Sequence, residues 1–598
     1  MTEQTLEVLY EKIENAKVIS FDMFDTLVYR LTNTPEDIFR MVGEHYQIAG
    51  FVKLRMREQD VISHKLFESK GYPHANMDEI YDHLATVYPE YDWMEIKAYE
   101  IQLEKDALKQ NTEMYDVFRH ALASGKKVVI TSDMYLNGDT IEDILTGCGY
   151  VGYHRLFVSS DERKAKFNKE LFACIKDEFS VEYSEILHIG DSQFADVDNP
   201  GSLGLETFLY EKGLEKEKNK NANCSIVDDG LYKILYHQDQ TFWYHLGIEV
   251  GGPLYMGLYL WLEKNLHQNE KIFFLARDGY NLYHLFQTLK VQHKTDHEIV
   301  YVETSRRALM LAGITQMNEE DIKLLPPYTF GQSVEEICEY LGVDAGRLQH
   351  LDQCGFSSVY DVIDNLEQVE NFRKIYVYNK ELFLETCKQE REYAKKYYES
   401  IGFFDGEAKV FDCGWNGSSQ YLLDRFLSAI GCDREYEFLY AGILNSPKSK
   451  KQLKGRKYGA YLFDHYKNYT LQERAKTAIV LLELFFSAGH PSIHAYSADG
   501  VVYEKNQPEA LKGDITKGII DYVTYGLDFV KKYNIEIMPD QALGRVYRLI
   551  EQPTEEEAVM IGNLTNADGF VDKKDEEKYI AHLTDESIEK NPHVELFW

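Results

Sequence analysis

Short apolar runs alternate with helical patterns along the first two hundred residues. Each run is long enough for a buried strand, and the segments between most of them repeat their apolar positions with helical spacing. The runs lie at 18–22, 126–133, 155–160, 185–191 and 204–210, and two of the helical patterns lie at 116–123 and 168–178. Because strands that alternate with helices form parallel sheets, this region predicts a doubly wound α/β domain.

One long interval in this region lacks strand signals. Residues 34–115 have helical periodicity and contain no apolar run comparable to the others. We therefore expect a helical subdomain inserted after the first strand. The sequence EKGLEKEKNKNAN at 211–223 is typical of a solvated connection. These features predict a first domain over 1–212 and a linker over 213–228.

A second set of apolar runs follows the predicted linker. Buried strands are predicted at 271–279, 298–307, 408–417 and 436–444, and the first three lead through a polar or glycine-containing turn into a helix. The pattern predicts a second, Rossmann-like α/β domain over 229–465 with a helical insertion over 309–400. Residues 466–598 are expected to be mainly helical, and Thr554 with Glu557 has the spacing of a capping box.

The net charge restricts the classes of partner. The chain of 598 residues carries 65 Lys and Arg against 99 Asp and Glu, which gives a formal charge of −34. This acidity favours solubility, excludes a nucleic acid polymer as a partner and disfavours an anionic membrane surface. The sequence shows no secretory pattern, no run of about 18 apolar residues and no CxxC pair among its 8 cysteines. We therefore expect a reduced, cytoplasmic protein without membrane insertion.

Side chains capable of chemistry follow four of the predicted strands of the first domain. The carboxyl ends of parallel strands meet at one edge of the sheet, so these side chains are expected to converge. Crowded carboxylates need a cation, and oxygen ligands favour Mg²⁺. A carboxylate facing that cation can attack phosphorus, while a lysine and a hydroxyl hold the phosphoryl oxygens. The candidate residues are Asp22, Thr131 or Ser132, Lys166, Asp191 and Asp196.

These segments resemble, in the same order, the four motifs of the haloacid dehalogenase (HAD) superfamily, whose members are mostly phosphohydrolases. The resemblance covers 15–212 and implies that the helical insertion is the cap that closes over the substrate. Ser132 is preferred over Thr131 because Ser132-Asp133 is similar to the Ser-Asn pair that often ends this strand in relatives. The resemblance implies that Asp22 is the nucleophile, that Ser132 and Lys166 hold the phosphoryl group, and that Asp191 and Asp196 bind Mg²⁺.

The sequence departs from the family pattern at Phe24, where the phosphatases typically carry a second Asp as general acid and base. The resemblance implies that the backbone carbonyl of Phe24 still contacts the metal. Loss of the acid removes a step worth about 10²–10⁴-fold in rate. The neighbouring Asp25 could substitute, the cap could supply an acid, or the substrate could have a good leaving group. A slow or vestigial catalyst is the further alternative, although carboxylates crowded without a cation repel one another.

Three predicted strand ends of the second domain also carry chemical groups. A helix begins after the glycine-containing turn at 414–417, and such a helix start presents free N–H groups to an anion. A phosphate or nucleotide-sugar pocket is one interpretation; ordinary turn residues with arginines in salt bridges are the other, and both stay open. Cys413 has no identifiable partner histidine, so the sequence assigns it no role. The pocket candidates are Arg277, Asp278, Arg306, Arg307, Asn416 and Gly417.

The order of motifs over the whole chain carries a second resemblance. FDMFDTL, TSDMYL, LARDGY, TSRRAL and FDCGWNGS follow one another as in a group of large, two-domain bacterial proteins of the HAD superfamily. That group often accompanies surface-polysaccharide or glycosyltransferase genes. This resemblance implies a setting in surface-glycan metabolism and cell-envelope glycan enzymes as partners.

The sequence thus predicts a Mg²⁺-dependent HAD phosphohydrolase or phosphotransferase that acts through an aspartyl-phosphate. Its expected substrate is a small phosphorylated metabolite or sugar phosphate. One alternative is a glycosyl- or phosphosugar transferase whose second domain binds a nucleotide sugar at Arg277, Asp278, Arg306 and Asn416. The other is a degenerate HAD scaffold that assembles with envelope enzymes.

Overall fold

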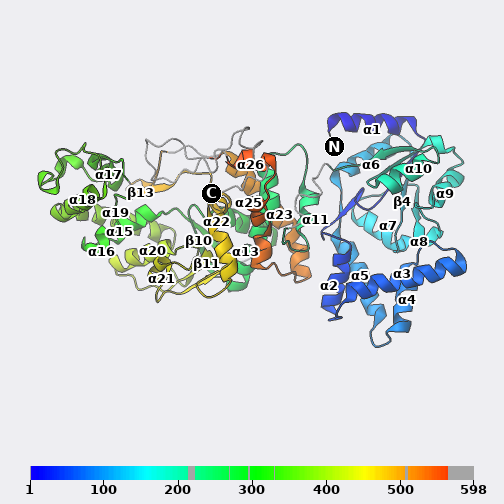
Figure 1. The fold of residues 1–598 in the computed structure, drawn as a ribbon, viewed down its shortest axis with the longest axis horizontal. Coiled ribbons are helices and arrows are strands. Elements are labelled where there is room, and N and C mark those ends of the chain that lie inside the picture. Colours follow the sequence, from blue (N-terminus) through cyan, green and yellow to red (C-terminus); the bar gives the residue numbers. More distant parts are fainter. Residues whose placement is uncertain are drawn as a thin grey trace. The chain divides into compact units, whose positions relative to one another are not determined.

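The computed structural model describes residues 2–212, 222–267, 270–293, 297–328, 330–505, 510–562 and 564. This part of the chain forms two compact units (Figure 1). The first unit contains 2–212 together with Cys224–Gln240 and Tyr525–Ile535. The second contains 222–223, Thr241–Thr524 and the described residues from Glu536 onwards.

A five-stranded parallel sheet forms the centre of the first unit. The strand order is β5-β4-β1-β6-β7, and every neighbouring pair is parallel. In this register Phe21 lies opposite both Ile130 and Ile189. All five predicted strands are present: β1 (Val18–Phe21), β4 (Lys127–Ser132), β5 (Arg155–Val158), β6 (Ile186–Gly190) and β7 (Glu206–Leu209).

Helices cover this sheet and bury its strands. β1 and β6 are buried along their whole length, which explains why they appear in the sequence as unbroken apolar runs. Phe172 and Ile175 pack against Val18 and Ile186 in one hydrophobic cluster. The helices of this layer are α1 (Glu3–Asn15), α6 (Thr112–Ala123), α7 (Gly138–Gly147), α8 (Ser159–Glu162), α9 (Glu170–Phe179) and α10 (Asn199–Gly201).

The insertion after β1 is helical, as the sequence predicts. It is framed by β2 (Val28–Arg30) and β3 (Leu108–Gln110), which pair antiparallel. A fully buried ion pair between Arg55 and Glu100, at 2.9 Å, joins two of its helices. The Tyr81 hydroxyl donates to the same Glu100 carboxylate at 2.5 Å. Its helices, drawn in blue in Figure 1, are α2 (Glu36–His45), α3 (Phe51–Lys70), α4 (Met77–Val87) and α5 (Trp93–Ala107).

The helix α11 (Asp228–Leu235) lies in the first unit, whereas the sequence analysis placed the start of the second domain at 229. The reason is a close backbone contact: a Cβ on Gly230 would lie 2.3 Å from the carbonyl oxygen of Leu31. The Asp229 N–H also donates to Asn33 Oδ1 at 2.8 Å. Of the predicted linker, residues 213–221 lie outside the described residues.

The second unit contains another five-stranded parallel sheet in its described part. The strand order is β12-β11-β10-β8-β9. The four predicted strands are present, and the short β12 adds a fifth that the sequence analysis did not predict. The strands are β8 (Lys271–Leu275), β9 (Glu298–Val302), β10 (Ala408–Trp415), β11 (Glu437–Ile443) and β12 (Tyr458–Ala460).

The predicted insertion between β9 and β10 is helical and belongs to the core of the second unit. Its first helix packs against α19 and against α20, which follows β10. Residues of the insertion share one hydrophobic cluster with Phe273 and Val410 of the sheet. The helices are α15 (Arg306–Gly313), α16 (Glu319–Ile322), α17 (Val334–Leu341), α18 (Leu366–Tyr378), α19 (Lys380–Ser400) and α20 (Ser418–Ala429).

The remaining described residues of the second unit are mainly helical. The capping box is confirmed, since Thr554 N–H donates to Glu557 at 2.8 Å and Glu557 N–H donates to Thr554 at 3.2 Å. Of the predicted C-terminal region, 563 and 565–598 lie outside the described residues. Its elements are α22 (Tyr469–Phe486), β13 (Ile493–Ser497), β14 (Gly500–Tyr503), α23 (Ala510–Lys532), α24 (Pro539–Ala542), α25 (Gly544–Glu551) and α26 (Glu555–Gly562).

The second unit also contains the helices α12 (Phe242–Leu246), α13 (Gly252–Asn265), α14 (Tyr280–His293) and α21 (Pro447–Gln452). The end of α23, from Tyr525, clusters with the first unit. In the described part of the chain, every helix is too short or too polar to cross a bilayer.

Candidate functional site

The connectivity of the first sheet predicts where a ligand binds. The chain runs from β1 to β4 and β5 on one side, and then continues with β6 and β7 on the other side of β1. Ligands of open parallel sheets bind outside the carboxyl ends of the strands at such a switch point. Asp22 directly follows β1, and Asp191 directly follows β6. The switch point therefore brings Asp22, from the first of the four segments, close to Asp191, from the last.

The predicted acidic residues form one cluster at this point. One carboxylate oxygen from each of Asp22, Asp191 and Asp196 lies within 4.8 Å of the others. Lys166 Nζ donates to Asp22 at 2.5 Å and to Asp196 at 2.7 Å. Asp22, Lys166 and Asp196 are 6%, 4% and 1% exposed, so bulk water screens their charges only weakly.

The loop that carries Lys166 is fixed by Asp133. Both carboxylate oxygens of Asp133 accept the Lys166 backbone N–H, at 2.9 and 3.0 Å. The sequence favours Ser132 as the motif hydroxyl and indicates no site role for the adjacent Asp133. In the structure Asp133 connects the end of β4 to the lysine and so positions the ammonium group.

Ser132 is the available hydroxyl at the end of β4. Thr131 Oγ1 is already within 2.8 Å of Ser20 Oγ, inside the sheet. Ser132 is fully buried, and its Oγ has no hydrogen-bond partner among the described residues. A buried hydroxyl without a partner is costly, so a ligand oxygen at this position would satisfy it.

His188 supports the acidic cluster from within β6, and the sequence analysis did not identify it. Its Nε2 lies 3.1 Å from Asp196 Oδ1, and its Nδ1 lies 2.8 Å from Ser20 Oγ. The Ser192 N–H donates to the other Asp196 oxygen at 3.0 Å. A polar residue in the middle of an apolar strand was the signal that could have found His188.

Burial is the main influence on the pKa values in the cluster, and neighbouring charges modify it. Burial raises the pKa of Asp22 to about 8, and Asp196 and Asp191 add to this effect against the opposing charge of Lys166. Burial and the charge of Asp25 raise the pKa of Asp191 to about 6. Burial acts in the same sense on Asp196, but hydrogen bonds from His188 and Lys166 hold its pKa below the ordinary value.

The donor set fits a magnesium ion. Among the described residues, one ammonium group, that of Lys166, forms ion pairs within the cluster of three carboxylates, whose donor atoms are all oxygens. Mg²⁺ prefers such hard oxygen ligands, and it would lower the cost of holding the carboxylates ionised together. Asp22, Asp191 and Asp196 are the residues that could hold it.

The turn after Asp22 carries Phe24 and Asp25, and the side chain of each contacts a cationic side chain. Phe24 forms an isolated bridge with Val28, and its ring lies 4.6 Å beneath the guanidinium carbon of Arg30. Asp25 has a left-handed backbone, with φ of 57°, and forms an ion pair with Lys233 of α11. Lys233 was missed because the sequence analysis assigned α11 to the second domain.

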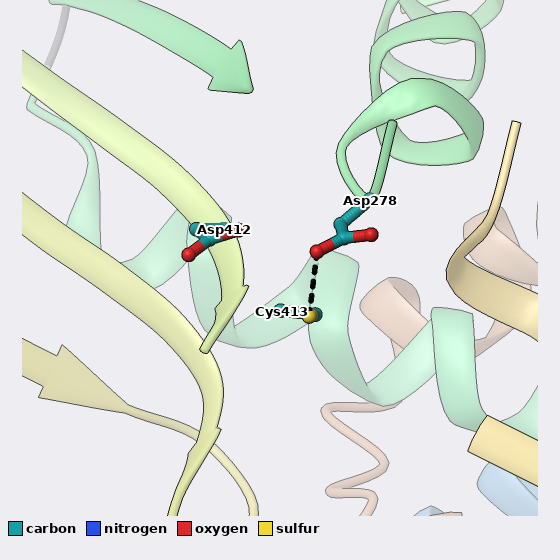
Figure 2. Close-up of side chains that lie close together, drawn as sticks. All are labelled: Asp278, Asp412 and Cys413. Carbon is teal, nitrogen blue, oxygen red and sulfur yellow. Dashed lines mark hydrogen bonds between the residues drawn. The ribbon is translucent and has the colours of Figure 1, made fainter. Parts of the chain in front are cut away.

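The second sheet has its own switch point. The chain runs from β8 to β9 on one side, and β10, β11 and β12 lie on the other side of β8. Figure 2 shows Asp278 on the loop after β8, with its carboxylate directed at the sulfur of Cys413, and Asp412 on the neighbouring β10. Cys413 Sγ donates to Asp278 Oδ2 at 2.7 Å. Donor atoms of the three residues lie within 4.8 Å of one another.

The electrostatics of this second cluster argue against a reactive thiolate. Burial, followed by the charge of Asp278, raises the pKa of Cys413, so the thiol stays protonated at neutral pH. Burial and Asp278 also raise the pKa of Asp412 to about 8, while Ser419 and Arg306 oppose this. The Cys413 thiol therefore keeps its proton and donates it in the hydrogen bond to Asp278.

The structure divides the predicted pocket residues of the second domain. Arg306 is exposed, and its charge opposes the rise in the pKa of Asp412. Arg277 is partly exposed and acts on the pKa of His490, which burial chiefly lowers.

The other three predicted residues have structural contacts. Arg307 is buried in an ion pair with Glu390 at 2.7 Å, as the salt-bridge interpretation predicted. Asn416 accepts a hydrogen bond from the Ser446 hydroxyl at 2.9 Å. A Cβ on Gly417 would lie 2.5 Å from Leu453, so this position packs closely against its neighbour.

Fold and site together define an α/β protein with two doubly wound parallel sheets and a carboxylate cluster at each switch point. No protein-family model and no curated protein matches the chain. Solved structures resemble about a third of it. They include L-2-haloacid dehalogenase from Xanthobacter autotrophicus, at 14% identity over 34% of this chain and 82% of that chain, with a TM-score of 0.26.

Two further solved structures show a similar degree of likeness. The putative HAD-hydrolase YfnB from Bacillus subtilis, bound to magnesium, is 17% identical over 34% of this chain and 91% of its own, with a TM-score of 0.26. The HAD family enzyme bt-2542 from Bacteroides thetaiotaomicron is 15% identical over 34% and 97%, with a TM-score of 0.27. At these identities the likeness concerns the fold and carries no statement about activity.

Proposed function

We propose that the first unit is a Mg²⁺-dependent phosphohydrolase or phosphotransferase of the HAD type that acts through an aspartyl-phosphate. The observation that carries this proposal is the cluster at the switch point. Asp22 lies beside Asp191 and Asp196, and its carboxylate accepts a hydrogen bond from Lys166 at 2.5 Å. The unpartnered hydroxyl of Ser132 ends the strand next to β1.

Each residue of the cluster has a role in this reaction. A carboxylate oxygen of Asp22 attacks phosphorus, and the bond from phosphorus to the leaving-group oxygen breaks. Lys166 and Ser132 hold the phosphoryl oxygens and stabilise the charge that develops on them. Water then attacks the aspartyl-phosphate, which releases phosphate and restores Asp22; an acceptor hydroxyl in place of water would give transfer.

The metal would be held by Asp22, Asp191, Asp196 and the backbone carbonyl of Phe24. When bound, Mg²⁺ supplies positive charge that offsets the repulsion between the attacking carboxylate and the phosphoryl oxygens. His188 and the Ser192 N–H orient Asp196 for this task, because each forms a hydrogen bond with a different oxygen of that carboxylate.

The substrate belongs to the proposal as well. A small phosphorylated metabolite or sugar phosphate suits a site next to a helical cap, predicted over 34–115 and formed in the structure by α2 to α5. A setting in bacterial surface-glycan metabolism, with envelope glycan enzymes as partners, is supported by the order of sequence motifs alone.

The test is a phosphate-release assay with Mg²⁺ over a panel of phosphate esters. Asp22→Asn removes the nucleophile, and we expect a loss of at least about 10²-fold, the scale of a lost catalytic group. Asp177→Asn, on the exposed face of α9, serves as the matched control and keeps full activity. If wild-type protein releases no more phosphate than Asp22→Asn, the proposal fails and the scaffold alternative takes its place.

A transferase centred on the second unit is the second candidate. Its support is the convergence of Asp278 and Asp412 at the second switch point, where the charge of Arg306 acts on Asp412. Calorimetry with UDP-glucose and Mg²⁺ tests it, with Arg306→Ala expected to weaken binding by about tenfold, as for one charged hydrogen bond. Arg347→Ala, an exposed arginine paired with Glu385, is the control. Absence of binding to wild-type protein contradicts this candidate.

A further inference from the structure

A chain of buried polar side chains crosses three neighbouring strands of the first sheet. It contains Thr131 of β4, Ser20 of β1 and His188 of β6, and all three residues are fully buried. Ser20 Oγ lies 2.8 Å from Thr131 Oγ1 and 2.8 Å from His188 Nδ1. The chain ends at Asp196, whose Oδ1 lies 3.1 Å from His188 Nε2. It therefore connects the residue before Ser132 to a proposed metal ligand.

The sheet itself brings these side chains together. The strand order places β1 between β4 and β6, and in the parallel register Ser20 lies opposite His188. Ser20 and His188 are the polar residues of two strands that are otherwise apolar. A buried polar group is costly unless it is hydrogen-bonded, and here each polar group is satisfied by the next. Such a connected set indicates a role beyond packing.

The chemistry of the donors and acceptors gives this chain a direction. A carboxylate only accepts hydrogen bonds, so the hydrogen of His188 lies on Nε2, towards Asp196. Burial lowers the pKa of His188, which favours the neutral ring. In a neutral ring with its hydrogen on Nε2, Nδ1 only accepts. The Ser20 hydroxyl must then donate to Nδ1 and accept from the Thr131 hydroxyl.

This direction matters for the position of Asp196. His188 holds one carboxylate oxygen, and the Ser192 N–H holds the other at 3.0 Å. Without the Ser20 hydroxyl, the ring could carry its hydrogen on Nδ1, and Nε2 would then face the carboxylate as a second acceptor. Two acceptors repel one another, so Asp196 would move from the place where it lies within reach of Asp22 and Asp191.

We infer that Thr131 and Ser20 are positioning residues for Mg²⁺, because through His188 they fix the metal ligand Asp196. This inference rests on the proposed function and deepens it. It also gives different roles to two adjacent hydroxyls. Ser132, whose hydroxyl has no partner among the described residues, holds the phosphoryl group, whereas the Thr131 hydroxyl is bonded inside the sheet and acts on the metal ligand.

Calorimetric titration of the full chain with MgCl₂ alone tests this assignment. The signal of this site is the part of the binding that Asp191→Asn abolishes. His188→Phe is expected to weaken Mg²⁺ binding at least about tenfold, the usual scale for a group that orients a metal ligand. Ser20→Ala and Thr131→Val each remove one neutral hydrogen bond, so we expect a loss of affinity of about fivefold in each.

Two further variants separate positioning from packing. His188→Gln can still donate an N–H to Asp196, so it should retain most of the affinity that His188→Phe loses. Ser160→Ala is the matched control, because Ser160 is a buried serine of the same unit whose hydroxyl donates to the Leu136 carbonyl oxygen at 2.7 Å. A purely structural role would lower the unfolding midpoint in EDTA and leave the Mg²⁺ affinity unchanged.

Steady-state kinetics with p-nitrophenyl phosphate then compares the two hydroxyls at the end of β4. At saturating Mg²⁺, Ser132→Ala is expected to lower kcat/KM at least about tenfold, as for one hydrogen bond to a charged group. Thr131→Val should keep the wild-type kcat/KM under the same condition. In the Mg²⁺ titration the order is reversed, because Thr131→Val loses affinity and Ser132→Ala keeps it.

The outcomes distinguish this inference from the proposed function. If the ester is turned over above the Asp22→Asn level but Ser20→Ala and Thr131→Val bind Mg²⁺ as wild type does, the positioning role is overturned and the phosphohydrolase stands. An equal loss of affinity in Ser160→Ala also overturns it. If Mg²⁺ binds but the ester is not turned over, the proposed function fails and the titration alone decides the positioning role. If wild-type protein does neither, both fail.

Discussion

Phe24 occupies the second position after the proposed nucleophile, where an acid would complete the catalytic set. Its ring lies under the guanidinium group of Arg30, and Arg30 is itself paired with Glu104 at 3.2 Å. A carboxylate at this position could therefore act as an acid towards the leaving group, and it would also lie close to the guanidinium group of Arg30. The nearest alternative acid, Asp25, is occupied by Lys233.

Phe24→Asp is expected to raise the rate of phosphate release from esters with poor leaving groups. General acid catalysis contributes about 10²–10⁴-fold, and partial capture of the new carboxylate by Arg30 would place the gain at the lower end. Steady-state kinetics with an alkyl phosphate measures it, and Phe24→Asn controls for loss of the ring. An equal rise in both variants would show that the acid is not the missing element.

Gly190→Ala tests the position of Asp196. A Cβ at 190 would lie 2.4 Å from the Asp196 carboxylate, so that side chain must move away from Lys166 and His188. We expect at least about a tenfold loss of Mg²⁺ affinity, as for other changes that misplace a metal ligand. Mg²⁺ titration of activity measures this loss.

Gly147→Ala is the matched control for that substitution, because a Cβ at 147 meets no atom within 4 Å. If Gly190→Ala and Gly147→Ala behave alike in the Mg²⁺ titration, the position of Asp196 has no part in metal binding.

At the scale of elements, the position of α11 determines which charge faces Asp25 beside the site. It brings Lys233 to Asp25, and it is held by backbone contacts at Gly230 and Asp229. The β2–β3 pair frames the helical insertion, and Val28 of β2 forms a bridge with Phe24 of the turn after Asp22. Both α11 and β2 therefore contact this turn.

Gly230→Ala is expected to displace α11. A methyl group 2.3 Å from the Leu31 carbonyl oxygen cannot be accommodated without a backbone shift, and such overpacking costs about 1–3 kcal/mol. Denaturant unfolding monitored on the full chain measures the loss of stability. Gly513→Ala, where nothing lies within 4 Å of the added Cβ, is the control. Equal stability of the two variants would contradict the close contact.

At the scale of the molecule, two parallel sheets each bring carboxylates together at a switch point. The chain carries a formal charge of −34, so a further cluster of like charges is unfavourable unless a cation or a proton neutralises it. In the first unit the hydrogen-bonded lysine only partly offsets three carboxylates. Metal binding should therefore be visible as stabilisation.

Mg²⁺ is expected to raise the unfolding midpoint of the full chain. A ligand that binds only the folded state contributes about 2.7 kcal/mol at a hundredfold excess over its Kd. Calorimetric melting with Mg²⁺ and with EDTA measures this effect. Asp191→Asn should abolish the Mg²⁺-dependent part, whereas Asp177→Asn should retain it. Equal midpoints in Mg²⁺ and EDTA would count against the metal site.

The sequence by itself determined the strands and the motif residues that follow them. This was possible because strands buried on both faces are unbroken apolar runs. Asp22 and Asp191 directly follow such a run, Ser132 ends one, and Lys166 lies a few residues beyond another. Apolar runs and the polar residues next to them can be recognised without knowing which distant segments of the chain pack against them. The helical character of the insertion was predicted for the same reason.

Only the tertiary structure decided which charges meet. Lys233 is 208 residues from its partner Asp25, and Arg307 is 83 residues from Glu390, so no local pattern could show that the first serves the site and the second the core. The same holds for His188, whose role depends on which strand lies beside β6. Side-chain type and spacing are properties of the chain, whereas the balance of charge at a site depends on which distant segments the packed sheet and helices bring together.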